Sequence, residues 1–279
     1  MVPIRLLLGK LRQIRNLLPI TLPKRLRSVI LDSIDSFLKP QKQFVAPLKL
    51  RYTLGQAQEF DGEAHVQSLR DLCKLQPNES VLDVGSGCGK IALSLAKYLS
   101  RKGLYEGLEI VKDFVDWCQN NISPIYPNFN FKHADIYNSS YNPNGASKAS
   151  QYKFPYKDKS FDVVVLSSVF THMLPRDMEN YLGEITRVLK DEGRCWISYF
   201  LVDGESKRFT NGEYTQVKFV NMGEYFVADP KVPENAVGYR EETVLKLYRK
   251  NKLDILYPIH HDSGGQDLIV ARKLLSKNN

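Results

Sequence analysis

Three glycines alternate over residues 85–89, directly after a short apolar run that contains Asp83. The apolar run predicts a buried parallel strand and residues 91–96 predict a helix, so the glycines occupy a strand-to-helix turn. Glycine has no Cβ, and the N–H groups at the start of a helix point outward. The backbone of this turn can therefore approach a bound molecule closely, and we expect it to bind a cofactor.

The glycine spacing discriminates between cofactors. A dinucleotide-binding turn needs small residues at the first, third and sixth positions, but the sixth position after Gly85 is Lys90, which disfavours NAD. A phosphate-binding P-loop is also excluded, because no Gly-Lys-Ser/Thr follows. The remaining pattern, Asp83-x-Gly85-x-Gly87-x-Gly89, resembles the class I S-adenosylmethionine-dependent methyltransferases. This resemblance implies that the turn, including Ser86, binds the methionine end of S-adenosyl-L-methionine.

Two more predicted strands end near a carboxylate. Residues 105–110 predict the second strand with Glu109 at its end, 20 residues after the last glycine, where a carboxylate can accept both ribose hydroxyls. Residues 129–136 predict the third strand. The resemblance assigns Asp135 to the adenine amino group, Ile136 to the ring and Ile110 to the same site. Taken singly, such acids are also common as helix caps, turn residues or solvated charges.

Residues 161–166 predict the fourth strand, and the segment that follows it, residues 167–173, bears on the reaction type. It reads Ser-Ser-Val-Phe-Thr-His-Met and lacks the Asn/Asp-Pro-Pro-Tyr/Phe typical of base N-methylation, and it resembles the small-molecule and glycan branch of the family. Ser168 is expected at the cofactor, and His172 is a candidate general base for a hydroxyl. The alternative for His172 is a packing residue that shapes the pocket. Because orientation supplies much of the acceleration in methyl transfer, a base is not obligatory.

The elements that position these residues predict an α/β fold. A crossover helix over residues 176–189, a turn over 190–194, a fifth strand over 195–200 and a closing antiparallel pair over 253–258 and 266–273 follow in order. The resemblance implies a Rossmann-like seven-stranded, mostly parallel sheet with helices on both faces and an antiparallel last strand. We expect one methyltransferase domain over residues 43–279. Its aromatic insertion, at about residues 203–240, is expected to cap the acceptor.

Residues 1–42 form a basic extension. They hold nine Lys or Arg against two Asp, a net charge of +7, whereas the rest of the chain carries +1. Apolar residues recur at helical spacing, which predicts amphipathic helices that either pack over the substrate side or, through residues 1–38, contact an anionic membrane surface. Charges interrupt both helices before a membrane span accumulates. The near-neutral remainder disfavours nucleic acid as a partner.

Neither the cysteines nor the histidines indicate a metal site. The four cysteines form no Cys-x-x-Cys pair, which predicts reduced thiols in a cytoplasmic enzyme, peripheral at the inner membrane surface if the extension binds lipid. His260 and His261 are adjacent and would point to opposite faces of a strand, so with Asp262 we expect no metal. The oligomeric state is left open.

The sequence predicts a methyltransferase that modifies an oxygen, or less often a nitrogen, of a small metabolite or of a glycan or lipid precursor. Two alternatives remain open: a protein or RNA methyltransferase, and a partner subunit that binds S-adenosylmethionine without catalysis. Only release of S-adenosylhomocysteine with an acceptor separates catalysis from binding alone.

Overall fold

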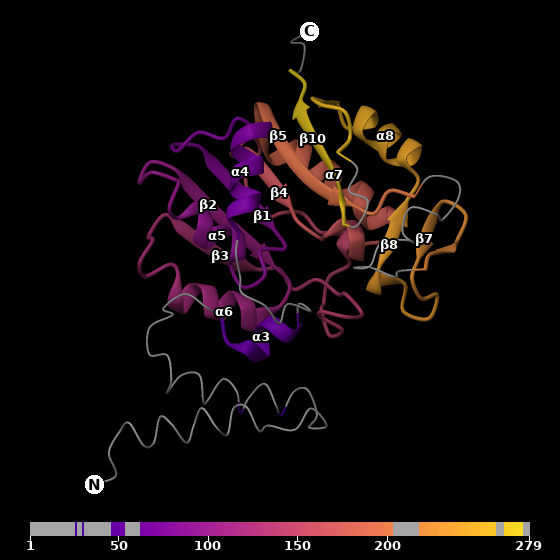
Figure 1. Cartoon of the computed structure of the whole chain (residues 1–279), viewed down its shortest axis with the longest axis horizontal. Helices are drawn as coiled ribbons and strands as arrows, with labels where there is room; N and C mark the ends of the chain where they lie inside the picture. The colour runs from indigo at the N-terminus through magenta and orange to yellow at the C-terminus, as the bar shows by residue number, and fades with distance from the viewer. Residues whose placement is uncertain are drawn as a thin grey trace.

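The structure is a computed structural model that describes residues 26, 30, 46–53, 62–202, 218–260 and 265–275 (Figure 1). Almost all of the basic extension, residues 1–42, therefore lies outside the described residues. Near the start of the predicted domain the chain forms a short helix, α3 (Leu48–Thr53). Among the described residues, no helix is long and apolar enough to span a bilayer.

A seven-stranded sheet organises the described chain, with the order β3-β2-β1-β4-β5-β10-β9. Its strands are β1 (Ser80–Val84), β2 (Leu104–Glu109), β3 (Phe129–His133), β4 (Phe161–Leu166), β5 (Leu189–Tyr199), β9 (Leu253–Ile255) and β10 (Asp267–Lys273). Strands β1 to β5 are parallel, and β10 runs antiparallel to both β5 and β9. The predicted Rossmann-like fold with its antiparallel closing strand is confirmed.

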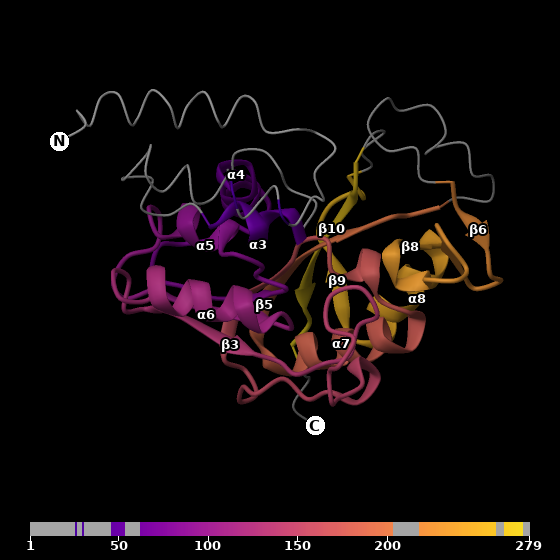
Figure 2. The same ribbon diagram turned by 90° about the horizontal axis from the view of Figure 1, so that it is seen from below.

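Helices cover both faces of this sheet (Figure 2). One face carries α4 (Glu63–Leu72), α5 (Lys90–Leu95) and α6 (Lys112–Asn121), and the other carries α7 (Pro175–Val188) and α8 (Glu241–Lys250). Successive residues of a strand point to opposite faces. Val163 and Val165 therefore pack in the core under α4, α5 and α6, whereas Val164 and Leu166 pack in the core under α7 and α8. Apolar residues on alternate faces explain why both helical layers pack against the strands.

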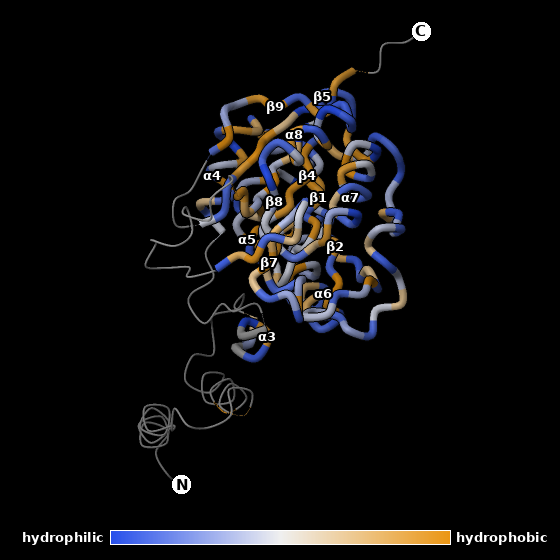
Figure 3. Tube along the Cα trace, turned by 90° about the vertical axis from the view of Figure 1, so that its right-hand side faces the viewer, coloured by the Kyte–Doolittle hydropathy of each residue, from blue (hydrophilic) through white to orange (hydrophobic). Residues whose placement is uncertain are grey.

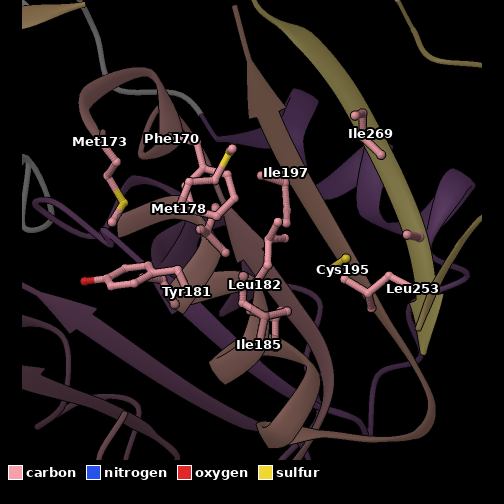
Figure 4. Packing of buried hydrophobic residues seen from close by; sticks show 14 of the residues in the cluster. Phe170, Met173, Met178, Tyr181, Leu182, Ile185, Cys195, Ile197, Leu253 and Ile269 are labelled. Carbon is pink, nitrogen blue, oxygen red and sulfur yellow. The ribbon is translucent and has the colours of Figure 1, made fainter. Parts of the chain in front are cut away.

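Helix α7 carries the larger of these cores (Figure 4). Met178, Leu182 and Ile185 recur at three- and four-residue spacing and pack towards Ile197 of β5. Each fully buried side chain of this kind stabilises the fold by about 1.5–3 kcal/mol. In the hydropathy view, apolar colour follows the central strands and polar colour the outer loops (Figure 3). The ends of the central strands are thus held by a well-packed interior.

Two strand boundaries differ from those predicted. Strand β5 starts at Leu189 rather than Cys195, because the expected turn at residues 190–194 is an irregularity within the strand: its pairing jumps from Phe161↔Leu189 to Val163↔Arg194. Glu192 takes a φ of +61° in this bulge. Strand β3 ends at His133, short of the predicted end at Ile136.

The described part of the insertion forms a second sheet. Strands β6 (Val220–Asn221), β7 (Tyr225–Val227) and β8 (Val237–Tyr239) pair antiparallel, and the short 3₁₀ turn η3 (Pro233–Asn235) lies between the last two. Strand β8 adjoins the end of β5, since the backbone N–H of Val202 donates to the carbonyl of Tyr239. This sheet places η3 beside the carboxyl ends of the main strands.

Candidate active site

A cavity of about 820 Å³ opens at the carboxyl ends of β1, β2, β4 and β5. This volume lies in the range of small-molecule sites, and the location is where open α/β sheets bind ligands. The predicted site residues that line it are Asp83, Gly85, Ser86, Gly87, Glu109, Ile110, Ile136, Ser168 and His172. Most of the predicted cofactor residues therefore meet in one place, although they come from four strand ends.

The glycine turn adopts backbone angles that other residues avoid. Gly85, Gly87 and Gly89 have φ values of +78°, +53° and +76°. Gly85 is also held between neighbours: its N–H donates to the carbonyl of Leu108 at 2.7 Å, and a Cβ added to it would clash with Val169 Cγ2. The bare backbone is therefore required both by the left-handed conformation and by the packing.

Replacing Gly85 by alanine is expected to reduce the free energy of unfolding by about 2–4 kcal/mol, combining left-handed strain with overpacking against Val169. Chemical denaturation measures this loss. Gly183→Ala is the matched control, because a Cβ at this helical position would meet only Asn251 Oδ1 at 3.7 Å. That control should be neutral or stabilising by up to about 1 kcal/mol. Equal effects of the two substitutions would contradict the strained turn.

Glu109 braces the turn from the next strand. It is only 6% exposed, its Oε2 accepts the N–H of Gly87 at 2.8 Å and its Oε1 accepts the N–H of Val111 at 2.8 Å. Burial raises the pKa of this carboxyl, and the backbone donors oppose that rise. An ionised carboxylate has about four acceptor positions, so both oxygens keep capacity beyond these two bonds. Contact with the ribose hydroxyls stays a prediction.

Asp83 is a buried carboxyl with one satisfied oxygen. The Tyr105 hydroxyl donates to its Oδ2 at 2.6 Å, while Oδ1 has no hydrogen-bond partner among the described residues. Burial raises the pKa of Asp83 to about 7, with the Tyr105 bond lowering it and Glu109 raising it. The Ser86 hydroxyl, also buried in the cavity wall, likewise has no partner in the described part of the chain. Both unpartnered polar atoms thus belong to residues that line the cavity.

We expect cofactor affinity to rise with pH through about 7. A ligand ammonium group near Asp83 favours the ionised carboxylate, so binding at neutral pH must release a proton, and affinity must fall as the carboxyl protonates. S-Adenosylhomocysteine, which carries the α-ammonium group, should bind about tenfold more tightly at about pH 8 than at about pH 6. Calorimetry in buffers of different ionisation enthalpy measures the number of protons released on binding, and Asp83→Asn should abolish this release. Proton uptake by the wild type would refute this assignment.

Two predicted residues lie apart from the cavity lining. Asp135 is exposed, because β3 ends two residues before it; its Oδ1 lies 3.4 Å from the Asn142 amide, and it does not line the cavity. Gly89 faces Ile122 and Cys118 of the helical layer instead. Its role is to let the turn pack against this layer. Asp135 is therefore absent from the cavity lining that contains Asp83 and Glu109, although its neighbours Ala134 and Ile136 belong to it, and its adenine contact stays a prediction.

Ser168 occupies a strained position at the end of β4. Its φ is +59°, which is unusual for a residue with a side chain. Its N–H donates to Ser198 Oγ at 2.8 Å, and the hydroxyls of both serines donate to Gln266 Oε1, at 3.0 and 2.6 Å. Ser198 and Gln266 also line the cavity. Neither residue was identified from the sequence as part of the site. Ser198 lies in β5 and Gln266 directly precedes β10, far along the chain from the glycine turn.

His172 is held in one tautomer by its surroundings. Its Nδ1 lies 2.9 Å from the carbonyl oxygen of Glu234, in η3. A carbonyl can only accept, so Nδ1 carries the proton and Nε2 holds the lone pair of the neutral ring. Burial lowers the pKa of His172, and backbone bonds to residues 234 and 235 oppose this. The lowered pKa favours the neutral ring, in which Nε2 is the nitrogen that can accept a proton.

The surroundings of His172 come from segments that the sequence did not mark as functional. The rings of Tyr141 and His172 meet edge-on, with their centroids 5.2 Å apart. The Asn138 amide donates to the His172 carbonyl at 3.2 Å. Asp177 and Glu234 line the same region. Asn138 and Tyr141 belong to a long polar stretch over residues 138–160, and its beginning forms this wall. Its unusual length was the one available signal.

Metal ligands and cysteines add little to this site. No cluster of three His, Cys, Asp or Glu is arranged to hold a metal within the described ranges. His260 lines the cavity, whereas His261 and Asp262 lie outside those ranges. All four cysteines are buried free thiols, and only Cys88 lines the cavity.

Comparison with known proteins places this geometry in a family. Residues 75–249 match a family model described as a methyltransferase domain. The chain is 26% identical over 163 residues to the tRNA N(3)-cytidine methyltransferase METTL2 of Gallus gallus, covering 57% of this chain and 40% of that protein. It is 27% identical over 124 residues to the ubiquinone/menaquinone biosynthesis C-methyltransferase UbiE of Wigglesworthia glossinidia brevipalpis, covering 44% of each. The matches thus span less than half the length of these relatives.

A solved structure shares the fold. The crystal structure of a putative sarcosine dimethylglycine methyltransferase from Galdieria sulphuraria superposes with a TM-score of 0.55 and 15% identity, covering 80% of this chain and 96% of that one. At this identity the likeness concerns the arrangement of strands and helices. The acceptor must be argued from the cavity.

Proposed function

We propose that this chain, which belongs to the S-adenosylmethionine-dependent methyltransferase family, methylates an oxygen of a small metabolite or of a glycan or lipid precursor. The observation that carries this proposal is the geometry of His172, which lines the cavity and whose ring donates Nδ1–H to the Glu234 carbonyl, so that Nε2 is the basic nitrogen. A hydroxyl needs such a base because its proton must leave as the new bond forms.

The residues present fit the cofactor of the family. The glycine turn leaves the backbone bare, and the buried Asp83 Oδ1 and Ser86 Oγ lack partners among the described residues. Asp83, Ser86 and the glycines would hold the methionine end, and Glu109 with Ile110 and Ile136 the adenosine end. When bound, the cofactor supplies a methyl group on a positively charged sulfur, which leaves readily as a neutral thioether.

The chain's own residues then have defined tasks. His172 Nε2 would accept the proton of an acceptor hydroxyl held beside it in the cavity. Ser168 and Gln266 hold the wall beside the strand end in one geometry. Orientation of this kind supplies up to about 7–11 kcal/mol of the acceleration in favourable cases.

RNA is the second candidate acceptor, favoured by the similarity to METTL2. Against it stand the near-neutral charge of residues 43–279 and the absence of Asn/Asp-Pro-Pro-Tyr/Phe after β4. Among the described residues that line the cavity, Lys90 is the one Lys or Arg. A phosphate backbone normally requires several such cations.

Release of S-adenosylhomocysteine tests the function directly. Sugars, sugar nucleotides, hydroxylated lipids, phenolics and unmodified tRNA are each incubated with the full chain and S-adenosylmethionine. The proposal expects product with a hydroxyl acceptor and a methyl ether in its mass spectrum. Methylated tRNA without any small product would favour the second candidate, and binding without any product would favour a non-catalytic partner subunit.

A further inference from the structure

Glu234 joins three segments of the cavity wall that are distant in the sequence. Its Oε2 accepts the backbone N–H of Ser139 at 2.6 Å, and its carbonyl oxygen accepts Nδ1–H of His172 at 2.9 Å. The Asn138 amide closes the circuit by donating to the His172 carbonyl at 3.2 Å. The insertion, the loop after β3 and the turn after β4 are thereby linked through one residue.

The position of the Glu234 carbonyl depends on this anchoring. It belongs to η3, a turn of three residues in which the N–H of Asn235 donates to the carbonyl of Val232. The Glu234 carboxylate and the bond from Ser140 Oγ to Asn235 Oδ1, at 2.7 Å, tie η3 to the loop after β3. Removing the carboxylate takes away one of these two ties, at the residue whose carbonyl accepts the His172 ring proton.

The consequence for His172 is electronic as well as geometric. A neutral imidazole carries its proton on either nitrogen, and only the Nδ1–H form satisfies the carbonyl. The other form would turn two lone pairs towards each other and would place the proton on Nε2, which could then no longer act as a base. A fixed carbonyl is what keeps the basic nitrogen available.

We infer that Glu234 is a positioning residue for methyl transfer, whose carboxylate anchors η3 so that its own carbonyl holds His172 in the Nδ1–H tautomer. The inference rests on the proposed function, in which His172 is the base. It differs from a role for the Glu234 charge in binding a cationic acceptor. Glutamine at position 234 separates the two roles, because it keeps an acceptor oxygen for Ser139 and loses the charge.

The first test needs no acceptor. In the full chain labelled with ¹⁵N-histidine, the His172 signals are identified by their loss in His172→Gln, and their shifts report which nitrogen is protonated. Wild type and Glu234→Gln should show the Nδ1–H form, and Glu234→Ala a mixture or the Nε2–H form. The exposed Glu224, in the same insertion, provides the control Glu224→Ala, which should match wild type. An unchanged tautomer in a folded Glu234→Ala would overturn the inference.

The second test uses turnover once an acceptor is identified. Glu234→Ala should lower kcat about 10- to 100-fold without weakening cofactor binding, and Glu234→Gln should recover most of the loss. If both variants lose activity equally, the charge matters and the positioning role is refuted. If no acceptor is ever found, the proposed function fails while the tautomer measurement still decides the inference.

Discussion

His172→Gln is expected to lower kcat about 10²- to 10⁴-fold while leaving the affinity for S-adenosylhomocysteine unchanged. Glutamine keeps polarity and approximate size but cannot accept a proton in the reaction. The loss is measured as S-adenosylhomocysteine released at saturating cofactor and acceptor. Calorimetry on the same preparation verifies the cofactor site.

The pH profile separates a base from a residue that only shapes the pocket. Burial holds the pKa of His172 below its ordinary value, so at saturating cofactor the wild-type kcat/KM for the acceptor should fall as pH drops through this lowered pKa and the ring protonates. The variant should lack this acidic limb. A variant with wild-type kcat would show that the acceptor loses its proton without help from His172.

Glu109→Ala is expected to weaken cofactor binding by about 2–4 kcal/mol, or roughly 30- to 1000-fold in Kd. The substitution leaves the N–H groups of Gly87 and Val111 without their acceptor, so the turn loses its brace as well as the predicted ribose contacts. Because charge-assisted hydrogen bonds are worth about 1.5–3 kcal/mol each, the loss should exceed that of an ordinary surface change.

Two further variants sharpen this measurement. Glu109→Gln retains one acceptor oxygen and should show an intermediate Kd. Glu106→Gln is the matched control: Glu106 lies on the same strand and is nearly buried, but its carboxylate contacts Lys132 and Asn130 outside the cavity lining. It should alter stability without altering Kd. Wild-type affinity in folded Glu109→Ala would remove Glu109 from the site.

The elements of the fold could largely be predicted because their signals are local. The apolar run before Gly85 and the helical spacing of apolar residues in α7 lie within single segments, and the structure buries those residues. The ends of the strands were harder to predict from the sequence. Strand β5 continues through the expected turn at residues 190–194 because its pairing with β4 absorbs the extra residues as a bulge, and β3 ends early, leaving Asp135 exposed.

One half of the candidate site could likewise be predicted from local signals, and the other half could not. Its cofactor half follows from strand ends that a parallel sheet necessarily brings to one edge. The proposed acceptor half depends on contacts of Asn138 with His172, His172 with Glu234 and Ser139 with Glu234, which span 34 to 95 positions of the chain. No periodicity or spacing encodes such contacts, and an unusually long polar loop was their only trace.

The sequence by itself determined the cofactor turn, since the need for glycine at positive φ is a property of the residue and its immediate neighbours. It also determined which strands would end beside that turn. Only the tertiary structure decided that Glu109 braces the turn through two backbone donors and that the His172 ring donates Nδ1–H to the Glu234 carbonyl. Both depend on where a distant N–H or carbonyl comes to rest, and folding alone places those groups.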